Sequence, residues 1–174
     1  MSDRPESNPM KMIRLEKVVL NMGVGRSGAA IETAQKALEQ ISNKKPTVHN
    51  AKAAQRDWGV RKGEPIGVSV TLRQDAAVAI LKRLFEAKGN VVKSKSFDNY
   101  GNYSFGIAEH IDIPDVKYDP KIGILGLDVS ITLTRPGFNI RLRSRHKARV
   151  GKGHTISSQE AENFLVERFG VESE

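Results

Sequence analysis

Apolar and polar residues alternate strictly in two stretches of the chain, which is the pattern of a β-strand with one buried and one exposed side. In residues 125–134 every second position is Leu, Val or Ile, and Gly, Asp, Ser or Thr fill the positions between them. Residues 66–73 repeat this pattern, with Ser69, Thr71 and Arg73 on the polar side. Further strands are predicted for residues 13–22, 47–49 and 103–113.

Apolar residues spaced three and four apart predict three helices between and after these strands. The first spans residues 27–42. The second spans residues 75–88 and has Asp75 as its N-cap. The last follows Ser157, which has a glutamate three residues later at capping-box spacing, and it ends at Gly170.

Because the strands are apolar on one side only, the predicted fold class is α+β. A largely antiparallel sheet would carry helices on one face and leave the other face open. The open face would present hydroxyl-bearing and basic side chains such as Ser69, Thr71 and Thr132. Such a face suits a sugar–phosphate backbone, although a merely solvated face is the ordinary outcome for this kind of sheet. We expect residues 10–174 to form one domain and residues 1–9 a flexible N-terminal tail.

The composition favours an anionic partner. The 174 residues carry a formal net charge of +8 and a pI of about 9.8, and nucleic acid is a commoner ligand than membrane for a globular basic protein. The absence of cysteine excludes disulfides and thiolate metal sites. Without a signal-like N-terminus or a run of about 18 apolar residues, we expect a soluble intracellular protein with no membrane partner.

Basic residues are concentrated near the C-terminus. From Arg135 to Lys152 there are seven arginines and lysines and no carboxylate. Residues 138–143 alternate between apolar and basic side chains, which predicts a strand with Arg141 and Arg143 together on its outer face. Guanidinium groups are permanently charged and bind phosphate bidentately, so this strand is a candidate RNA contact. A solvated charged face is the alternative.

Residues 23–28 match the motif G-x-G-x-x-G between a predicted strand and a predicted helix, which is the context of a dinucleotide-binding fold. An acidic residue should follow about 20 positions later, yet residues 40–56 contain no carboxylate. The alternating strands also differ from the continuous apolar runs of a parallel sheet. We therefore favour an RNA phosphate at this helix start over a nicotinamide or flavin enzyme, which is the alternative.

No other pattern indicates catalysis. The four histidines lack metal-ligand spacing, and the acidic residues between 112 and 119 form neither a calcium loop nor a clear acid–base pair. No catalytic residue, metal ion or cofactor is therefore predicted. The aromatic residues Phe97, Tyr100, Tyr103 and Phe105 could stack on RNA bases or pack in the core, and the sequence leaves both interpretations open.

Several blocks occur along the chain in a fixed order. They are LEKVVLNMGVG at 15–25, KP at 45–46, RKGEPIG at 61–67, VTLR at 70–73, SFDNYGNYS at 96–104, IP at 113–114, YD at 118–119, GLD at 126–128 and RPGF at 135–138. Together they resemble the family of large-subunit ribosomal protein five, which binds 5S ribosomal RNA. The resemblance covers residues 10–171. The C-terminal part is similar to the archaeal and eukaryotic branch, because bacterial members lack the basic extension.

This resemblance implies a structural protein and not an enzyme. It would lie in the large ribosomal subunit in the cytoplasm, attach 5S rRNA in the central protuberance and contact the peptidyl-site tRNA. The implied partners are 5S rRNA, large-subunit rRNA, this tRNA and neighbouring ribosomal proteins. A basic RNA chaperone outside the ribosome is the remaining alternative.

The resemblance also points to individual residues. It assigns Asn21 and Thr71 to 5S rRNA, and it assigns Lys44 a phosphate contact where bacterial relatives carry glutamine. The loop directed toward tRNA corresponds to residues 55–64. The open face and the resemblance together predict an rRNA-binding set of Asn21, Lys44, Lys45, Ser69, Thr71, Arg73, Thr132, Arg141 and Arg143. The predicted tRNA-contacting residues are Arg56, Arg61 and Lys62.

Overall fold

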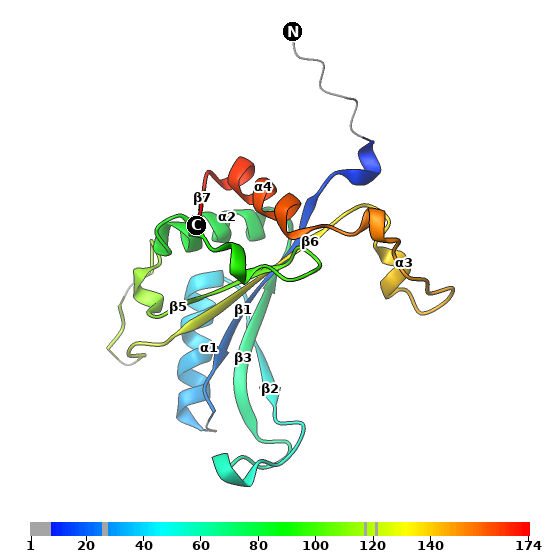
Figure 1. Ribbon diagram of the computed structural model, residues 1–174. Helices are drawn as coiled ribbons and strands as arrows, with labels where there is room; N and C mark the ends of the chain where they lie inside the picture. The colour runs from blue at the N-terminus through cyan, green and yellow to red at the C-terminus, as the bar shows by residue number, and fades with distance from the viewer. Residues whose placement is uncertain (1–7, 26–27, 117, 121) are drawn as a thin grey trace.

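A five-stranded antiparallel sheet forms the centre of the protein (Figure 1). The computed structural model describes residues 8–25, 28–116, 118–120 and 122–174. Most of the predicted N-terminal tail (residues 1–7) and residues 26–27 of the glycine motif lie outside this part. In sheet order the strands are β2 (Thr47–Asn50), β3 (Pro65–Leu72), β1 (Arg14–Gly23), β6 (Leu127–Thr134) and β5 (Tyr103–Ile107).

Helices α1 (Ala29–Ser42) and α2 (Gln74–Ala87) cover one face of this sheet, with α1 against β3 and α2 against β1. The alternation in the sequence determines which face is covered, since the residues buried beneath the helices occupy every second position of the long strands. Each fully buried Val, Leu or Ile side chain stabilises the fold by about 1.5–3 kcal/mol. The predicted α+β class with one open face is confirmed.

A smaller layer lies beside the sheet (Figure 1). Helix α4 (Ser158–Phe169) leads into β7 (Glu172–Ser173), which pairs in parallel with β4 (Val91–Val92). These strands were not predicted, because two residues are too few for an alternating pattern. The remaining elements are the short helix α3 (Asn139–Leu142) and the 3-10 turns η1 (Pro9–Lys11), η2 (Arg56–Trp58), η3 (Ser94–Ser96), η4 (His110–Asp112) and η5 (Lys152–His154).

The aromatic cluster divides between core and surface. Tyr103 and Phe105 are buried, and their ring centroids lie 5.5 Å apart. Phe97 lies 4.7 Å from Tyr103, and Phe85 of α2 stacks on Phe105 at 5.6 Å. Tyr100 alone of the predicted cluster is exposed. Core packing is therefore the correct interpretation for Phe97, Tyr103 and Phe105.

Two predicted boundaries are wrong for local reasons. The strand predicted for residues 103–113 ends at Ile107, because its partner β6 begins at Leu127, which is the register partner of Ile107. Asp75 does not cap α2, because that helix begins one residue earlier and Asp75 lies in its first turn. A carboxylate there still interacts favourably with the positive end of the helix dipole.

The basic strand predicted for residues 138–143 is also wrong, because this segment contains α3 instead. Gly137, at a φ of 92°, turns the chain away after β6, and both edges of β6 are already paired with β1 and β5. With no free strand edge beside it, the segment satisfies its backbone locally. The Ile140 amide donates to the Gly137 carbonyl at 3.3 Å, and the Arg143 amide donates to the Asn139 carbonyl at 2.9 Å.

Arg135 connects the end of β6 to the start of α4. Its side chain is only 5% exposed and donates to Glu160 at 2.7 Å. It also donates to the carbonyls of His154 and Thr155. Glu160 at the same time completes the predicted capping box with Ser157, which is confirmed. One of the seven basic residues noted in the sequence therefore has a structural role.

Glu160→Gln should lower the free energy of unfolding by about 2 kcal/mol near neutral pH. The amide keeps the capping-box acceptor but leaves the buried guanidinium without its counter-charge. We expect less than for a fully buried pair, because the Glu160 side chain is 47% exposed. Urea unfolding monitored by circular dichroism measures the difference, and a change in the free energy below about 0.5 kcal/mol would contradict it.

The same substitution should change how stability depends on pH. The hydrogen bond from the Ser157 amide, assisted by Arg135, lowers the pKa of Glu160 below its ordinary value of 4.5. A carboxylate with a lowered pKa stabilises the fold above its unfolded-state pKa, and this contribution is lost as the pH falls through the folded-state value. The parent and Glu160→Gln should therefore differ most above pH 4.5 and converge in more acidic solution.

Candidate nucleic-acid interface

The uncovered side of the sheet, called the open face here, consists of cross-strand rows of small polar side chains. Strand register sets these rows, because directly opposed residues of paired strands point to the same side. The two central rows are Thr47–Ser69–Asn21–Asp128–Gly106 and Thr71–Val19–Ser130–Ser104. Hydroxyl and amide groups dominate both rows, so the face can donate and accept hydrogen bonds across several strands.

Four residues predicted to contact RNA lie together on the open face: Asn21, Ser69, Thr71 and Thr132. Two residues that the prediction omitted join them. Lys17 is the register partner of Thr132, and the His49 Nε2 lies 2.6 Å from the Ser69 Oγ. Lys17 shares the every-second-residue spacing of Asn21, so the alternation within β1 could have identified it. His49 lies in a strand too short for this signal.

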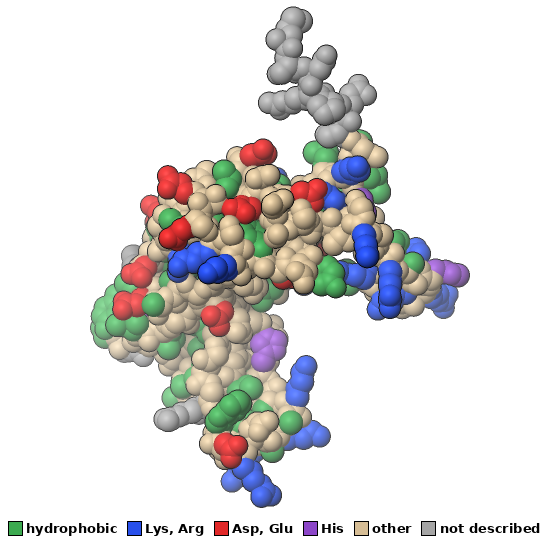
Figure 2. Space-filling model, in the orientation of Figure 1, with side chains coloured by type: hydrophobic (Ala, Val, Ile, Leu, Met, Phe, Trp, Pro, Cys, Tyr) green, Lys and Arg blue, Asp and Glu red, His purple; other side chains and the backbone are tan. Residues whose placement is uncertain are grey.

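Most cations near the open face come from two projections beyond the strand ends. The basic arm (residues 136–152) follows Thr134, which pairs with Arg14 at the start of β1. The β2–β3 loop (residues 51–64) lies at the opposite end of β1, next to Gly23. A ten-residue strand separates the two by about 30 Å. Figure 2 shows Lys and Arg gathered on the arm at the right and on the loop at the bottom, whereas Asp and Glu are concentrated over the helices above.

The basic arm holds Arg141 and Arg143 outside the sheet. The Arg141 guanidinium lies 5.9 Å from the centre of the Phe138 ring, and the Arg143 Nε donates to the His146 carbonyl at 2.8 Å. The Ala148 amide donates back to the Ile140 carbonyl at 3.2 Å. These contacts give the arm a defined shape while residues 141–149 remain exposed.

Most of the β2–β3 loop is exposed, and backbone hydrogen bonds connect its two sides. Gln55 and Val60 exchange two such bonds, at 2.9 and 3.0 Å. Between them lies η2 with Trp58, whose side chain is 78% exposed. The three predicted tRNA-contacting residues, Arg56, Arg61 and Lys62, are exposed around it. Trp58 was not predicted as a contact, although a single tryptophan in a polar loop was an available signal.

The remaining predicted contacts lie at the margins of the open face. Lys44 and Lys45 are exposed between α1 and β2, next to the row that begins at Thr47. Arg73 follows β3, and its guanidinium lies 3.5 Å from the Glu16 carboxylate. Arg73 is therefore partly neutralised by a neighbour, and the two lysines are the stronger candidates for phosphate contacts.

The antiparallel sheet excludes a dinucleotide-binding fold around the glycine motif. A dinucleotide fold requires parallel strands joined by crossover helices, and β1 pairs antiparallel with both of its neighbours.

Within the described part of the chain, no group of His, Asp and Glu is arranged to hold a metal ion. None of the described helices is long and apolar enough to span a bilayer.

Comparison with known proteins identifies a protein family for the chain. Residues 8–61 match the model of Ribosomal protein L5, and residues 65–166 match that of the ribosomal L5P family C-terminus. The chain is 70% identical to large ribosomal subunit protein uL5 of Nitrosopumilus maritimus, over 98% of each chain. It is 64% identical to the uL5 protein of Cenarchaeum symbiosum, over 94% of this chain and 96% of the relative. The chain therefore belongs to the uL5 family, whose members are structural, non-enzymatic constituents of the large subunit of the cytoplasmic ribosome.

Proposed function

We propose that this protein binds 5S rRNA and attaches it in the central protuberance of the large ribosomal subunit. The observation that carries this proposal is the open face, a sheet surface of hydroxyl and amide groups with a cationic projection at each end. Large-subunit rRNA and neighbouring ribosomal proteins would be further partners. Family membership supports a ribosomal setting, and the arrangement of charge supports an RNA ligand.

The open face and the projections would have different tasks. Ser69, Thr71 and Asn21 can exchange hydrogen bonds with ribose 2′-hydroxyls and base edges, which distinguish a folded RNA from any other polyanion. The arginines and lysines of the basic arm, together with Lys44 and Lys45, would bind phosphates and supply most of the affinity. The sheet would therefore determine selectivity, and the projections would determine salt sensitivity.

The β2–β3 loop would contact the peptidyl-site tRNA. Arg56, Arg61 and Lys62 are exposed on a projection far from the basic arm, so a second RNA can approach them while 5S rRNA occupies the open face. Trp58 offers a large exposed ring beside them. A ring and several cations suit a nucleic acid of variable sequence, because neither contact depends on sequence.

Filter binding to 5S rRNA at several salt concentrations tests this division. If about six phosphates are neutralised, the logarithm of the affinity should fall with the logarithm of salt at a slope of about −4 to −5. Arg143→Ala should flatten this slope by about one, since it removes one phosphate contact. Thr71→Ala should weaken binding at an unchanged slope, because it removes a neutral hydrogen bond.

Lys36→Ala is the matched control for Arg143→Ala, because Lys36 is an exposed cation on α1. This variant should retain the parent's slope. Equal affinity of the parent for 5S rRNA and for an unrelated duplex of the same length would contradict the proposal. Failure of the protein to co-sediment with large subunits in moderate salt would instead favour an RNA chaperone outside the ribosome.

A further inference from the structure

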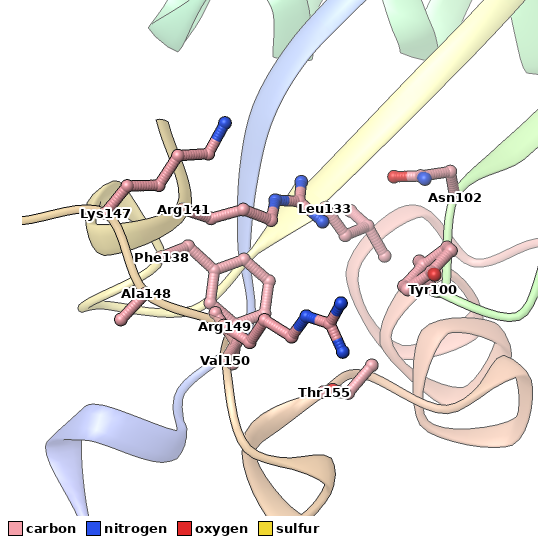
Figure 3. Close-up of a pocket in the computed structure, with 10 residues that line it drawn as sticks. All are labelled: Tyr100, Asn102, Leu133, Phe138, Arg141, Lys147, Ala148, Arg149, Val150 and Thr155. Carbon is pink, nitrogen blue, oxygen red and sulfur yellow. The ribbon is translucent and has the colours of Figure 1, made fainter. Parts of the chain in front are cut away.

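A pocket of about 640 Å³ lies where the basic arm folds back toward the turn before β5 (Figure 3). Leu133 of β6 contributes an apolar wall, and Phe138 and Tyr100 flank it from the arm and from the turn. Arg141 and Arg149 line the same space. Of these residues, Arg141 belongs to the predicted rRNA-binding set, and Tyr100 is one of the aromatic residues for which the sequence left base stacking open.

The positive charge of the pocket favours an anionic ligand. In Figure 3 the guanidinium groups of Arg141 and Arg149 extend into the space between Phe138 and Tyr100. Lys147 adds a third cation, and no aspartate or glutamate is among the described residues that line the pocket. Two guanidiniums directed into one concave site are suited to a phosphate group, which each can bind bidentately.

The aromatic side chains of the pocket favour a planar group in the ligand. Phe138 is already engaged, with Arg141 over its ring and His154 5.6 Å away at an angle of 73°. Tyr100 is 59% exposed and makes no ring contact among the described residues. Its backbone is fixed, since the Asp98 carboxylate accepts from the Tyr100 amide at 2.9 Å. Tyr100 therefore presents an exposed ring from a turn whose backbone is held in place.

Asn102 supplies a polar group at the rim. Its Nδ2 donates to Asp98 at 2.7 Å, which fixes the orientation of the side-chain amide and leaves the Oδ1 as an acceptor for a ligand. A fixed carbonyl oxygen accepts a hydrogen bond from the exocyclic amino group that adenine, guanine and cytosine carry.

We propose that this pocket binds one unstacked nucleotide of the bound RNA. The phosphate would lie between Arg141 and Arg149, the base would stack on Tyr100, and its amino group would donate to Asn102. The volume lies in the range of sites for single small ligands, and unstacked bases are the parts of RNA that aromatic side chains bind. This inference rests on the proposed function, because it assumes that the ligand of the basic arm is RNA.

Titration of the full-length 15N-labelled protein with adenosine 5′-monophosphate tests the pocket. We expect AMP to shift the amide signals of Tyr100, Asn102 and Arg149, and ribose 5-phosphate to bind at least about fivefold more weakly because it cannot stack. Tyr100→Ala should weaken AMP binding by a similar factor, whereas Tyr100→Phe, which keeps a stacking ring, should bind within about twofold of the parent. Tyr118→Ala is the matched control, since that tyrosine is 57% exposed elsewhere.

Three outcomes would contradict the proposal that this pocket binds a nucleotide. Equal binding of AMP and ribose 5-phosphate would indicate a simple anion site, tighter binding of an acidic peptide would indicate a protein partner, and the absence of shifts up to about 10 mM AMP would indicate no site. The result is separable from the proposed function. If the protein binds 5S rRNA selectively but does not bind AMP, only the proposed nucleotide site is contradicted. If it binds AMP but not 5S rRNA, the proposed function is contradicted.

Discussion

Thr71→Glu should reduce the affinity of the protein for 5S rRNA by about 100-fold or more. Thr71 is exposed in the middle of the open face, so a carboxylate there would meet RNA phosphates at close range with little water between them. Like charges brought together in an interface cost several kcal/mol, and about 3 kcal/mol corresponds to a factor of more than 100. Equilibrium filter binding at one fixed salt concentration measures the change.

A glutamate at position 71 should leave the fold undisturbed. The register partner of Thr71 on β1 is Val19, which is neutral, whereas a glutamate at position 21 would lie directly opposite Asp128 and weaken strand pairing. Gln40→Glu on the exposed side of α1 makes the matched change of overall charge away from the open face. If both variants bind equally well and both unfold like the parent, the open face does not contact the RNA.

Gly101→Ala should lower the free energy of unfolding by about 3 kcal/mol. A methyl group at position 101 would lie 2.6 Å from the Cγ2 of Ile156, which is fully buried and packed beside Ala161 of α4. Overpacking of this kind costs about 1–3 kcal/mol. The backbone adds about 1–2 kcal/mol, because Gly101 has a φ of 74°, where an L-residue is strained. Urea unfolding monitored by circular dichroism gives the total.

Gly170→Ala separates the two contributions. Gly170 has a similar φ of 67° at the end of α4, but a methyl group there would have no atom within 4 Å. We expect this control to lose only the backbone contribution, about 1–2 kcal/mol. Equal losses for both variants would show that the turn before β5 moves away from Ile156 at little cost. Tyr100 would then also lack the fixed position that the proposed pocket requires.

The sequence predicts those parts of the fold that follow from local periodicity. Residues 66–73 and 125–134 alternate over their whole length, and they contain most of β3 (Pro65–Leu72) and all of β6 (Leu127–Thr134), each with the predicted side buried. The capping box at Ser157 was equally predictable, because it requires only two side chains three positions apart. The open face follows from these alternations, so Ser69, Thr71 and Thr132 could be placed before the structure was known.

The errors occur where an alternating segment has no partner. Residues 138–143 have a strand-like pattern, but alternation does not reveal whether a strand edge is available. Both edges of β6 are paired, so the segment forms α3 and moves Arg141 and Arg143 from the sheet to the basic arm. Residues 108–113 fail for the same reason, since β6 begins opposite Ile107. The role of Arg135 was also hidden, because burial of a cation depends on Glu160, 25 positions later.

The contacts of Arg135 have a consequence for how RNA is received. This residue precedes the basic arm, and its guanidinium reaches the carbonyls of His154 and Thr155, which follow the arm. The two stems of the arm are thus joined at one point, and the entropy of closing this loop is lost when the chain folds and not when RNA arrives. An incoming phosphate chain would have only side chains to order, so more of each contact would appear as net affinity.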